Sequence, residues 1–165
     1  MSILERFRDE QDESSAKKLA DKLSSQDRTI SVIEPASSGL VSYRLSHNQS
    51  TSKVFLEGVI PNSFESYQQF ISLDEINSSF PHKQVSNDHD AQLLANNVRE
   101  QTSADIGVSV LAPLDGTAGQ TVFVGLNIDG RQIGVFKEEF DFRSQNVEKK
   151  ISEFVIFNLL RELSR

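Results

Sequence analysis

Two adjacent serines, Ser37 and Ser38, are the residues whose type and position could support nucleophilic chemistry. They lie in the run Glu34-Pro35-Ala36-Ser37-Ser38-Gly39, between a short apolar segment and a segment with helical spacing. A serine hydroxyl attacks a carbonyl only when an adjacent base takes its proton and donors stabilise the oxyanion. Serine is also among the best N-terminal caps of a helix. We therefore expect these hydroxyls to cap the following helix, with nucleophilic attack as the alternative.

The same turn could bind an anion, because the first N–H groups of a helix lack intrahelical partners and carry partial positive charge. Glu34 could orient the turn by accepting backbone hydrogen bonds, and Arg143 could contact an anion at the start of the last helix. The net charge of −7 opposes such binding, so we expect it to be no tighter than about 1 mM. The candidate ligand-binding residues are Glu34, Ser37, Ser38, Gly39 and Arg143.

Metal chemistry has little support in this sequence. His47, His82 and His89 are scattered through polar stretches, without a carboxylate cluster at metal-ligand spacing. The absence of cysteine excludes disulfides, thiolate zinc sites and cysteine nucleophiles. We expect neither a metal nor a cofactor.

Alternating apolar residues identify the strands that would position these groups. Val122, Val124, Leu126 and Ile128 are two residues apart and so share one face of a strand, and Ile133 and Val135 repeat the pattern. Asp129-Gly130 between them supplies the positive φ angles that a two-residue hairpin turn needs. We expect five strands, near residues 29–34, 54–60, 106–111, 120–128 and 131–138.

Helical spacing fills most of the remaining chain. We expect helices near 14–23, 40–45, 63–71, 86–98 and 144–163, with Ser63, Ser86 and Ser144 at the starts of the last three. Phe154 and Val155 should be buried against the sheet. The alternation of helices and strands predicts an α/β fold, a three-layer α/β/α domain whose five-stranded sheet is mixed because of the hairpin.

Composition narrows the class of protein. A chain of 165 residues predicts one domain, which we place at residues 15–165 after a charged N-terminal extension at 1–14. No Lys/Arg stripe interrupts the acidic balance, so we expect no nucleic-acid partner. No apolar run approaches the roughly 20 residues of a membrane span. The first ten residues lack a secretory apolar region, which predicts a cytoplasmic protein.

Several stretches, taken in order, resemble the C-terminal domain of competence-induced protein A (CinA). Residues 33–39 match the family's Ala-Glu-Ser-Cys-Thr-Gly-Gly, and residues 51–67 match its Ser-Ser-x-Val-Phe-x-Gly-Gly-Val-Val-Ala-Tyr-Ser-Asn-Glu-Ala-Lys. Ala104-Asp105-Ile106-Gly107-Val108 is similar to its Ala-Asp-x-Gly-x, and Thr121-Val122-Phe123 to its Gly-Thr-Val-Tyr. The resemblance covers roughly residues 15–163 and implies the CinA fold. Stand-alone members are nicotinamide mononucleotide amidohydrolases, so it also implies that activity as a candidate.

The positions that carry the family's chemistry are altered here. The family's candidate serine nucleophile falls on Pro35, its tyrosine on Asn62 and its lysine, the natural base, on Tyr67. Its glycine loop is replaced by residues 111–116. Its arginines near the last helix fall on Ser144, beside Arg143, and on Glu148.

The sequence therefore favours a CinA-like protein without the amidohydrolase site, with a role in binding a partner protein or a ligand. One alternative is an active amidohydrolase (deamidase) of nicotinamide mononucleotide that uses Ser37 or Ser38, although no lysine lies between Lys53 and Lys83 to act as its base. Another is a nucleotide-binding module at residues 35–39. The partner could be another protein, a second copy of the chain, or a weakly bound anion or mononucleotide.

Overall fold

A computed structural model describes residues 3–48, 53–71, 87–113 and 117–165. Its centre is a five-stranded sheet in the order β2-β1-β3-β4-β5. The strands are β1 (Ile30–Ile33), β2 (Phe55–Val59), β3 (Ile106–Leu111), β4 (Gly119–Ile128) and β5 (Arg131–Asp141). The first three are parallel, whereas β4 and β5 are antiparallel to their neighbours, which confirms the mixed sheet.

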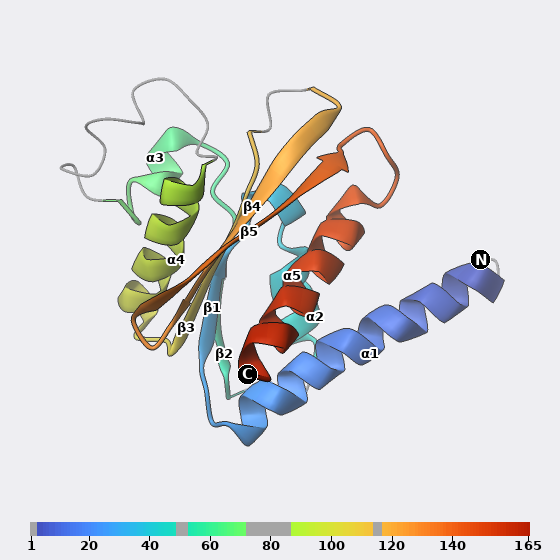
Figure 1. Ribbon diagram of the computed structural model, residues 1–165, viewed down its shortest axis with the longest axis horizontal. Helices are drawn as coiled ribbons and strands as arrows, with labels where there is room; N and C mark the ends of the chain where they lie inside the picture. The colour runs from blue at the N-terminus through green and yellow to red at the C-terminus, as the bar shows by residue number, and fades with distance from the viewer. Residues whose placement is uncertain (1–2, 49–52, 72–86, 114–116) are drawn as a thin grey trace.

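Helices cover both faces of the sheet and confirm the three-layer α/β/α domain (Figure 1). Helices α1 (Ile3–Ser25), α2 (Leu40–Ser46) and α5 (Val147–Leu163) lie on one face, and α3 (Phe64–Tyr67) and α4 (Asp88–Thr102) lie on the other. A single turn of 3₁₀ helix, η1 (Pro35–Ser37), joins β1 to α2. Helix α1 continues without a break through residue 14, and its N-terminal half extends away from the other elements.

The β4–β5 hairpin forms as its sequence predicts. Asp129 and Gly130 have φ angles of 53° and 80°, the left-handed values that the two-residue turn requires. The four alternating apolar residues of β4 are all buried in the cluster beneath α1, α2 and α5: Val122, Val124, Leu126 and Ile128. The pattern fails at Ile133, because the pairing of β5 skips it and leaves its side chain 38% exposed.

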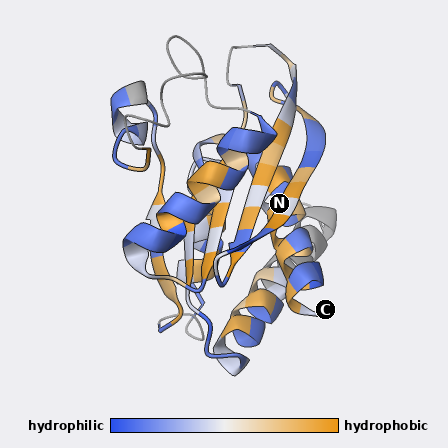
Figure 2. Ribbon diagram, turned by 60° about the vertical axis from the view of Figure 1, so that its left-hand side comes forward, coloured by the Kyte–Doolittle hydropathy of each residue, from blue (hydrophilic) through white to orange (hydrophobic). Residues whose placement is uncertain are grey.

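Helix α4 approaches the sheet closely because small residues face it. A Cβ atom on Gly107 would lie 1.9 Å from the carbonyl oxygen of Ala95, and one on Gly125 would lie 2.1 Å from that of Ala91. Figure 2 views this side, with polar and apolar bands alternating along α4 and apolar colour on the strands behind it. Only glycine at these strand positions leaves room for the helix backbone.

Two predicted helix starts are wrong. The N-cap of α4 is Asn87, whose Oδ1 accepts the N–H of Asp90 at 2.8 Å, and Ser86 lies outside the described residues. Helix α5 begins at Val147 after Asn146, which has a φ of 60°, and not at Ser144. Ser63 does cap α3, since its hydroxyl accepts the N–H of Ser66 at 3.2 Å, as predicted.

Helix α5 buries the stripe expected of it, with one exception. Ile151, Val155 and Leu159 are at most 1% exposed. Phe154, predicted to be buried, lies only half-buried at the margin of the core, where it meets Phe140 of β5 edge-on at 5.9 Å. Its position on the helix turns it toward the rim of the sheet.

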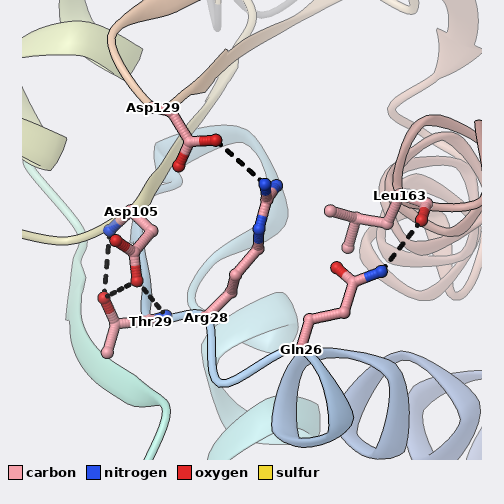
Figure 3. A network of polar contacts seen from close by, with 6 residues as sticks. All are labelled: Gln26, Arg28, Thr29, Asp105, Asp129 and Leu163. Atoms are coloured by element: carbon pink, nitrogen blue, oxygen red, sulfur yellow. Dashed lines mark hydrogen bonds and ion pairs between the residues drawn. The ribbon is translucent and has the colours of Figure 1, made fainter.

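A polar network fastens the end of the sheet at which β1 and β3 begin (Figure 3). The carboxylate of Asp105 accepts the backbone N–H and the hydroxyl of Thr29, both at 2.8 Å, and the N–H of Asp105 donates back to the Thr29 hydroxyl at 3.0 Å. Arg28 forms an ion pair with Asp129 of the hairpin turn at 2.9 Å. These bonds tie the segment after α1 to β3 and to the hairpin.

Candidate functional site

The turn after β1 is organised by the buried carboxylate of Glu34. Its side chain is 0% exposed. One oxygen accepts the hydroxyl of Ser37 and, at 2.9 Å, the N–H of Val41; the other accepts the N–H of Ser42 at 2.6 Å. A single carboxylate therefore binds the preceding turn and the first turn of α2 together, and a negative charge at a helix N-terminus is favourable.

This arrangement corrects two predictions. The N-cap of α2 is Gly39, and neither Ser37 nor Ser38 caps this helix; the carboxylate of Glu34 does so instead. The N–H groups of Val41 and Ser42, expected to lack partners, are already bonded to that carboxylate. An incoming anion would meet a carboxylate at the start of this helix, and not the free N–H donors that the sequence predicts. The predicted role of Glu34 as an acceptor of backbone hydrogen bonds is confirmed.

The two serines differ in their surroundings. Ser37 is fully buried and donates its hydroxyl to Glu34, whereas Ser38 is exposed. Ser38 and Gly39 adopt left-handed φ angles of 53° and 85°, which reverse the chain between η1 and α2. A Cβ atom on Gly39 would lie 2.5 Å from Cδ1 of Ile60, so the residue that follows β2 lies against this turn.

Pro35 and Tyr67, which the resemblance places at site positions of the family, are packing residues. Pro35 is buried in the first turn of η1, where its fixed φ suits a helix start. Tyr67 is half-buried against the apolar cluster beneath α4, and burial raises its pKa well above the ordinary value. Asn62 is exposed, two residues beyond Ile60.

Arg143 lies in the connection between β5 and α5, which is not part of this turn. It is exposed, and its backbone N–H donates to Oδ1 of Asp141 at 2.9 Å within the β5–α5 connection. Glu148 is half-buried in the first turn of α5. The 3₁₀ turn packs against α5, so this helix forms one wall beside the turn.

A contact that sequence reasoning missed joins α2 to α5. Arg44 donates to the hydroxyl of Ser152 at 2.7 Å, and Ser152 is completely buried. Nothing in the spacing of either residue marks the pair, because they are 108 positions apart. This hydrogen bond holds α2 against α5.

The described residues contain no group of three or more His, Cys, Asp or Glu side chains arranged to hold a metal ion. His47 is exposed and stacks on Tyr43 at 5.3 Å, and His82 lies outside the described residues. His89 lies 3.6 Å from the carboxylate of Asp90. None of the described helices is long and apolar enough to cross a membrane.

The chemistry available at this turn is limited by its own hydrogen bonds. The Ser37 hydroxyl donates to a carboxylate that also holds two backbone N–H groups, and all four residues from Glu34 to Ser37 are buried. Pro35, which the resemblance places at the family's nucleophile position, is buried, and Tyr67, which it places at the family's lysine, is half-buried. The turn is a buried, hydrogen-bonded connection between β1 and α2.

Comparison with known proteins gives a consistent family assignment. The sequence model of the CinA C-terminal domain matches residues 12–163. A Bacillus cereus (strain G9842) protein whose name describes it as competence-damage inducible is 29% identical over 140 residues, which are 82% of this chain and 34% of that protein. A similarly named Streptococcus pneumoniae (strain TIGR4) protein is 29% identical over 149 residues, 87% of this chain and 35% of its own. The chain thus spans about a third of the length of these curated relatives.

Solved structures share the fold at lower identity. A competence or damage-inducible protein from Enterobacter asburiae superposes with a TM-score of 0.75 at 22% identity, covering 92% of this chain and 98% of that one. A competence/damage inducible protein from Agrobacterium tumefaciens reaches 0.70 at 13% identity, covering 93% and 96%. At these identities the likeness concerns the arrangement of the elements alone.

Proposed function

We propose that this chain, which belongs to the CinA C-terminal domain family, is a binding protein that does not hydrolyse amides. The single observation that carries the proposal is the buried carboxylate of Glu34, which holds the Ser37 hydroxyl and the first turn of α2. In this arrangement Ser37, two residues after the family's nucleophile position, is fully buried and is part of the fold.

The altered family positions support the same proposal. Pro35 has no hydroxyl to attack a carbonyl. Tyr67, which stands at the position of the family's lysine, keeps its proton at neutral pH because the ordinary pKa of tyrosine is 10.0, and burial raises that pKa further. A serine nucleophile needs both a base and an oxyanion site within hydrogen-bond reach. The loss of one member of such a unit costs several orders of magnitude in rate.

The test is ammonia release from nicotinamide mononucleotide, with Ser37→Ala and Ser38→Ala as variants. We expect the unmodified protein to release ammonia no faster than buffer alone. Turnover that Ser37→Ala or Ser38→Ala abolishes would establish the amidohydrolase alternative. The double change Pro35→Ser with Tyr67→Lys should not restore full activity, because the family's glycine loop and helix arginine are also replaced.

The other alternative, a nucleotide-binding module, is tested by calorimetry with phosphate and with mononucleotides at low ionic strength. Glu34 already occupies the N–H groups of Val41 and Ser42, so we expect no binding tighter than about 1 mM. Micromolar binding of a mononucleotide would favour the module over a protein-binding role.

A further inference from the structure

We infer that Asp129-Gly130, at the tip of the β4–β5 hairpin, is a site at which aspartate converts spontaneously to isoaspartate, and that the ion pair between Arg28 and Asp129 slows this conversion. The sequence places glycine directly after this aspartate, and the structure places both residues in an exposed turn. The inference does not depend on what the protein binds.

The reaction needs only these two residues and water. The backbone nitrogen of Gly130 attacks Cγ of Asp129, so that a C–N bond forms and closes a succinimide ring. One carboxyl oxygen leaves as water, with the proton of the N–H group and a second proton that the carboxylate takes up from solvent. Water then opens the ring. Opening at Cγ restores aspartate, whereas opening at the backbone carbonyl carbon of Asp129 gives isoaspartate, in which the chain continues through Cβ and Cγ.

The nitrogen that attacks is unobstructed. The N–H of Gly130 donates no hydrogen bond to the described residues, whereas the N–H of Asp129 donates to the carbonyl oxygen of Asp105 at 2.8 Å. A Cβ atom on Gly130 would have one neighbouring atom within 4 Å, Nη2 of Arg99 at 3.7 Å. Because glycine carries no side chain, nothing at position 130 crowds the approach of its nitrogen to Cγ of Asp129.

Water reaches the same turn. The side chain of Asp129 is 49% exposed, and Gly130 is also exposed, so both carbonyl carbons of the ring would be open to hydrolysis. Ile128 and Arg131 pair on either side and close the hairpin. The two turn residues are therefore the part of the hairpin that can react while its strands stay paired.

Arg28 holds the carboxylate away from the attacking nitrogen. Nη2 of Arg28 lies 2.9 Å from Oδ2 of Asp129, and Figure 3 shows the carboxylate directed toward this guanidinium. The carboxylate must leave this position before Cγ can face the nitrogen of Gly130. The side chains of the pair are 32% and 49% exposed, and ion pairs at such exposure are weak. The pair therefore slows the reaction without preventing it.

The experiment ages the folded full chain at physiological temperature in neutral buffer made with H₂¹⁸O. Protein isoaspartate methyltransferase with S-adenosylmethionine detects isoaspartate, and tandem mass spectrometry of electron-transfer fragments locates it. We expect isoaspartate at position 129, with one ¹⁸O atom incorporated there when the ring opens. New amide signals of ¹⁵N-labelled protein should be restricted to the hairpin near residues 127–132, because the additional backbone carbon does not fit a two-residue turn.

Arg28→Gln and Arg131→Gln are a matched pair of variants, because each removes one positive charge beside the turn and only Arg28 is ion-paired with Asp129. Arg28→Gln should raise the rate at Asp129 about threefold, the factor by which an exposed ion pair shifts an equilibrium. Arg131→Gln should leave that rate unchanged. Asp115-Gly116, the other Asp-Gly pair of the sequence, lies outside the described residues and is the internal reference. Neither variant should change its rate.

Three results would overturn the inference. Isoaspartate at position 129 only in protein unfolded with urea would show that the folded turn prevents attack. Folded protein that incorporates no ¹⁸O at Asp129 would show that the ring does not form. Equal rates at Asp129 in the unmodified protein and in Arg28→Gln would show that the ion pair does not control the reaction.

Discussion

The hydroxyl of Ser109 on β3 lies 2.6 Å from the carbonyl oxygen of Ala91 on α4 and donates to it. The same hydroxyl accepts the N–H of Gly125 on β4 at 3.2 Å. One buried side chain thus joins a helix to two strands, at a point where glycine lets the helix backbone approach closely. The fit between α4 and the sheet depends on the smallness of these residues.

We therefore predict that Gly125→Ala destabilises the fold by about 3 kcal/mol, because its new methyl group would meet the backbone of Ala91, which cannot rotate away. Gly119→Ala is the matched control. Its methyl group would meet only Oε1 at the flexible end of Glu139, so its cost should stay below about 0.5 kcal/mol. Urea denaturation of the unmodified protein and the two variants measures the difference in unfolding free energy. A loss for Gly125→Ala as small as that for Gly119→Ala would show that α4 can shift at little cost.

The capping carboxylate gives the second prediction. Glu34→Ala leaves the N–H groups of Val41 and Ser42 without their acceptor, so unfolding free energy should fall by about 2–3 kcal/mol. Ser37→Ala removes one hydroxyl and keeps the carboxylate on both N–H groups, so it should cost about 1 kcal/mol. Chemical denaturation distinguishes them. If Ser37→Ala cost as much as Glu34→Ala, the hydroxyl and not the cap would hold the turn.

The strands and the hairpin were predictable because their signals are local. Alternation of apolar residues and the Asp129-Gly130 turn act over a few positions, and the structure confirms both. The cap of α2 was not predictable by the same means. Sequence position predicts the nearest hydroxyls, those of Ser37 and Ser38, as the caps. The acceptor that the helix uses is Glu34, seven and eight residues before the N–H groups it binds.

Other misses have similar causes. Helix α5 starts after Asn146, which has a left-handed conformation. Sequence position alone does not indicate that conformation, and Ser144, a common N-cap residue, lies two positions earlier. Phe154 satisfies helical spacing for burial, but the sheet ends beside it and leaves it at the rim.

The two sides of α5 should respond very differently to truncation. Ile151→Ala removes a side chain that is 0% exposed and should cost about 2–5 kcal/mol. Phe157→Ala removes a larger side chain that is 63% exposed and should change stability by no more than about 0.5 kcal/mol. Thermal and urea unfolding measure both. A large loss for Phe157→Ala would mean that the exposed ring supports the fold.

The polar network beneath β1 and β3 allows a matched comparison of two aspartates. Asp105→Asn weakens an acceptor of two hydrogen bonds from Thr29 in a half-buried position, so we expect a loss of about 1–2 kcal/mol. Asp129→Asn removes an exposed ion pair with Arg28 and keeps a residue suited to positive φ, so the loss should be about 0.5 kcal/mol or less. Raising the salt concentration should reduce the loss of unfolding free energy caused by Asp129→Asn and should leave the loss caused by Asp105→Asn unchanged.

The last prediction concerns alkaline pH. Burial raises the pKa of Tyr67 above its ordinary value of 10.0. Between the pKa of the unfolded chain and the higher pKa of the folded chain, the unfolded chain loses the phenolic proton and the folded chain keeps it. The unfolded state then binds fewer protons, so the free energy of unfolding falls as pH rises. The contribution is complete below about pH 10 and is lost progressively above it.

Tyr67→Phe should therefore lose less stability than the unmodified protein between about pH 8 and about pH 10.5, as measured by urea unfolding at each pH. Tyr43→Phe is the matched control, because Tyr43 is 59% exposed, and it should lose as much as the unmodified protein. The chain has two tyrosines and no tryptophan, so the tyrosinate absorbance of Tyr43→Phe reports Tyr67 alone. That absorbance should appear only as the protein unfolds. Its appearance at about pH 10 in the folded protein would show that Tyr67 is open to solvent and contradict the packed position on α3.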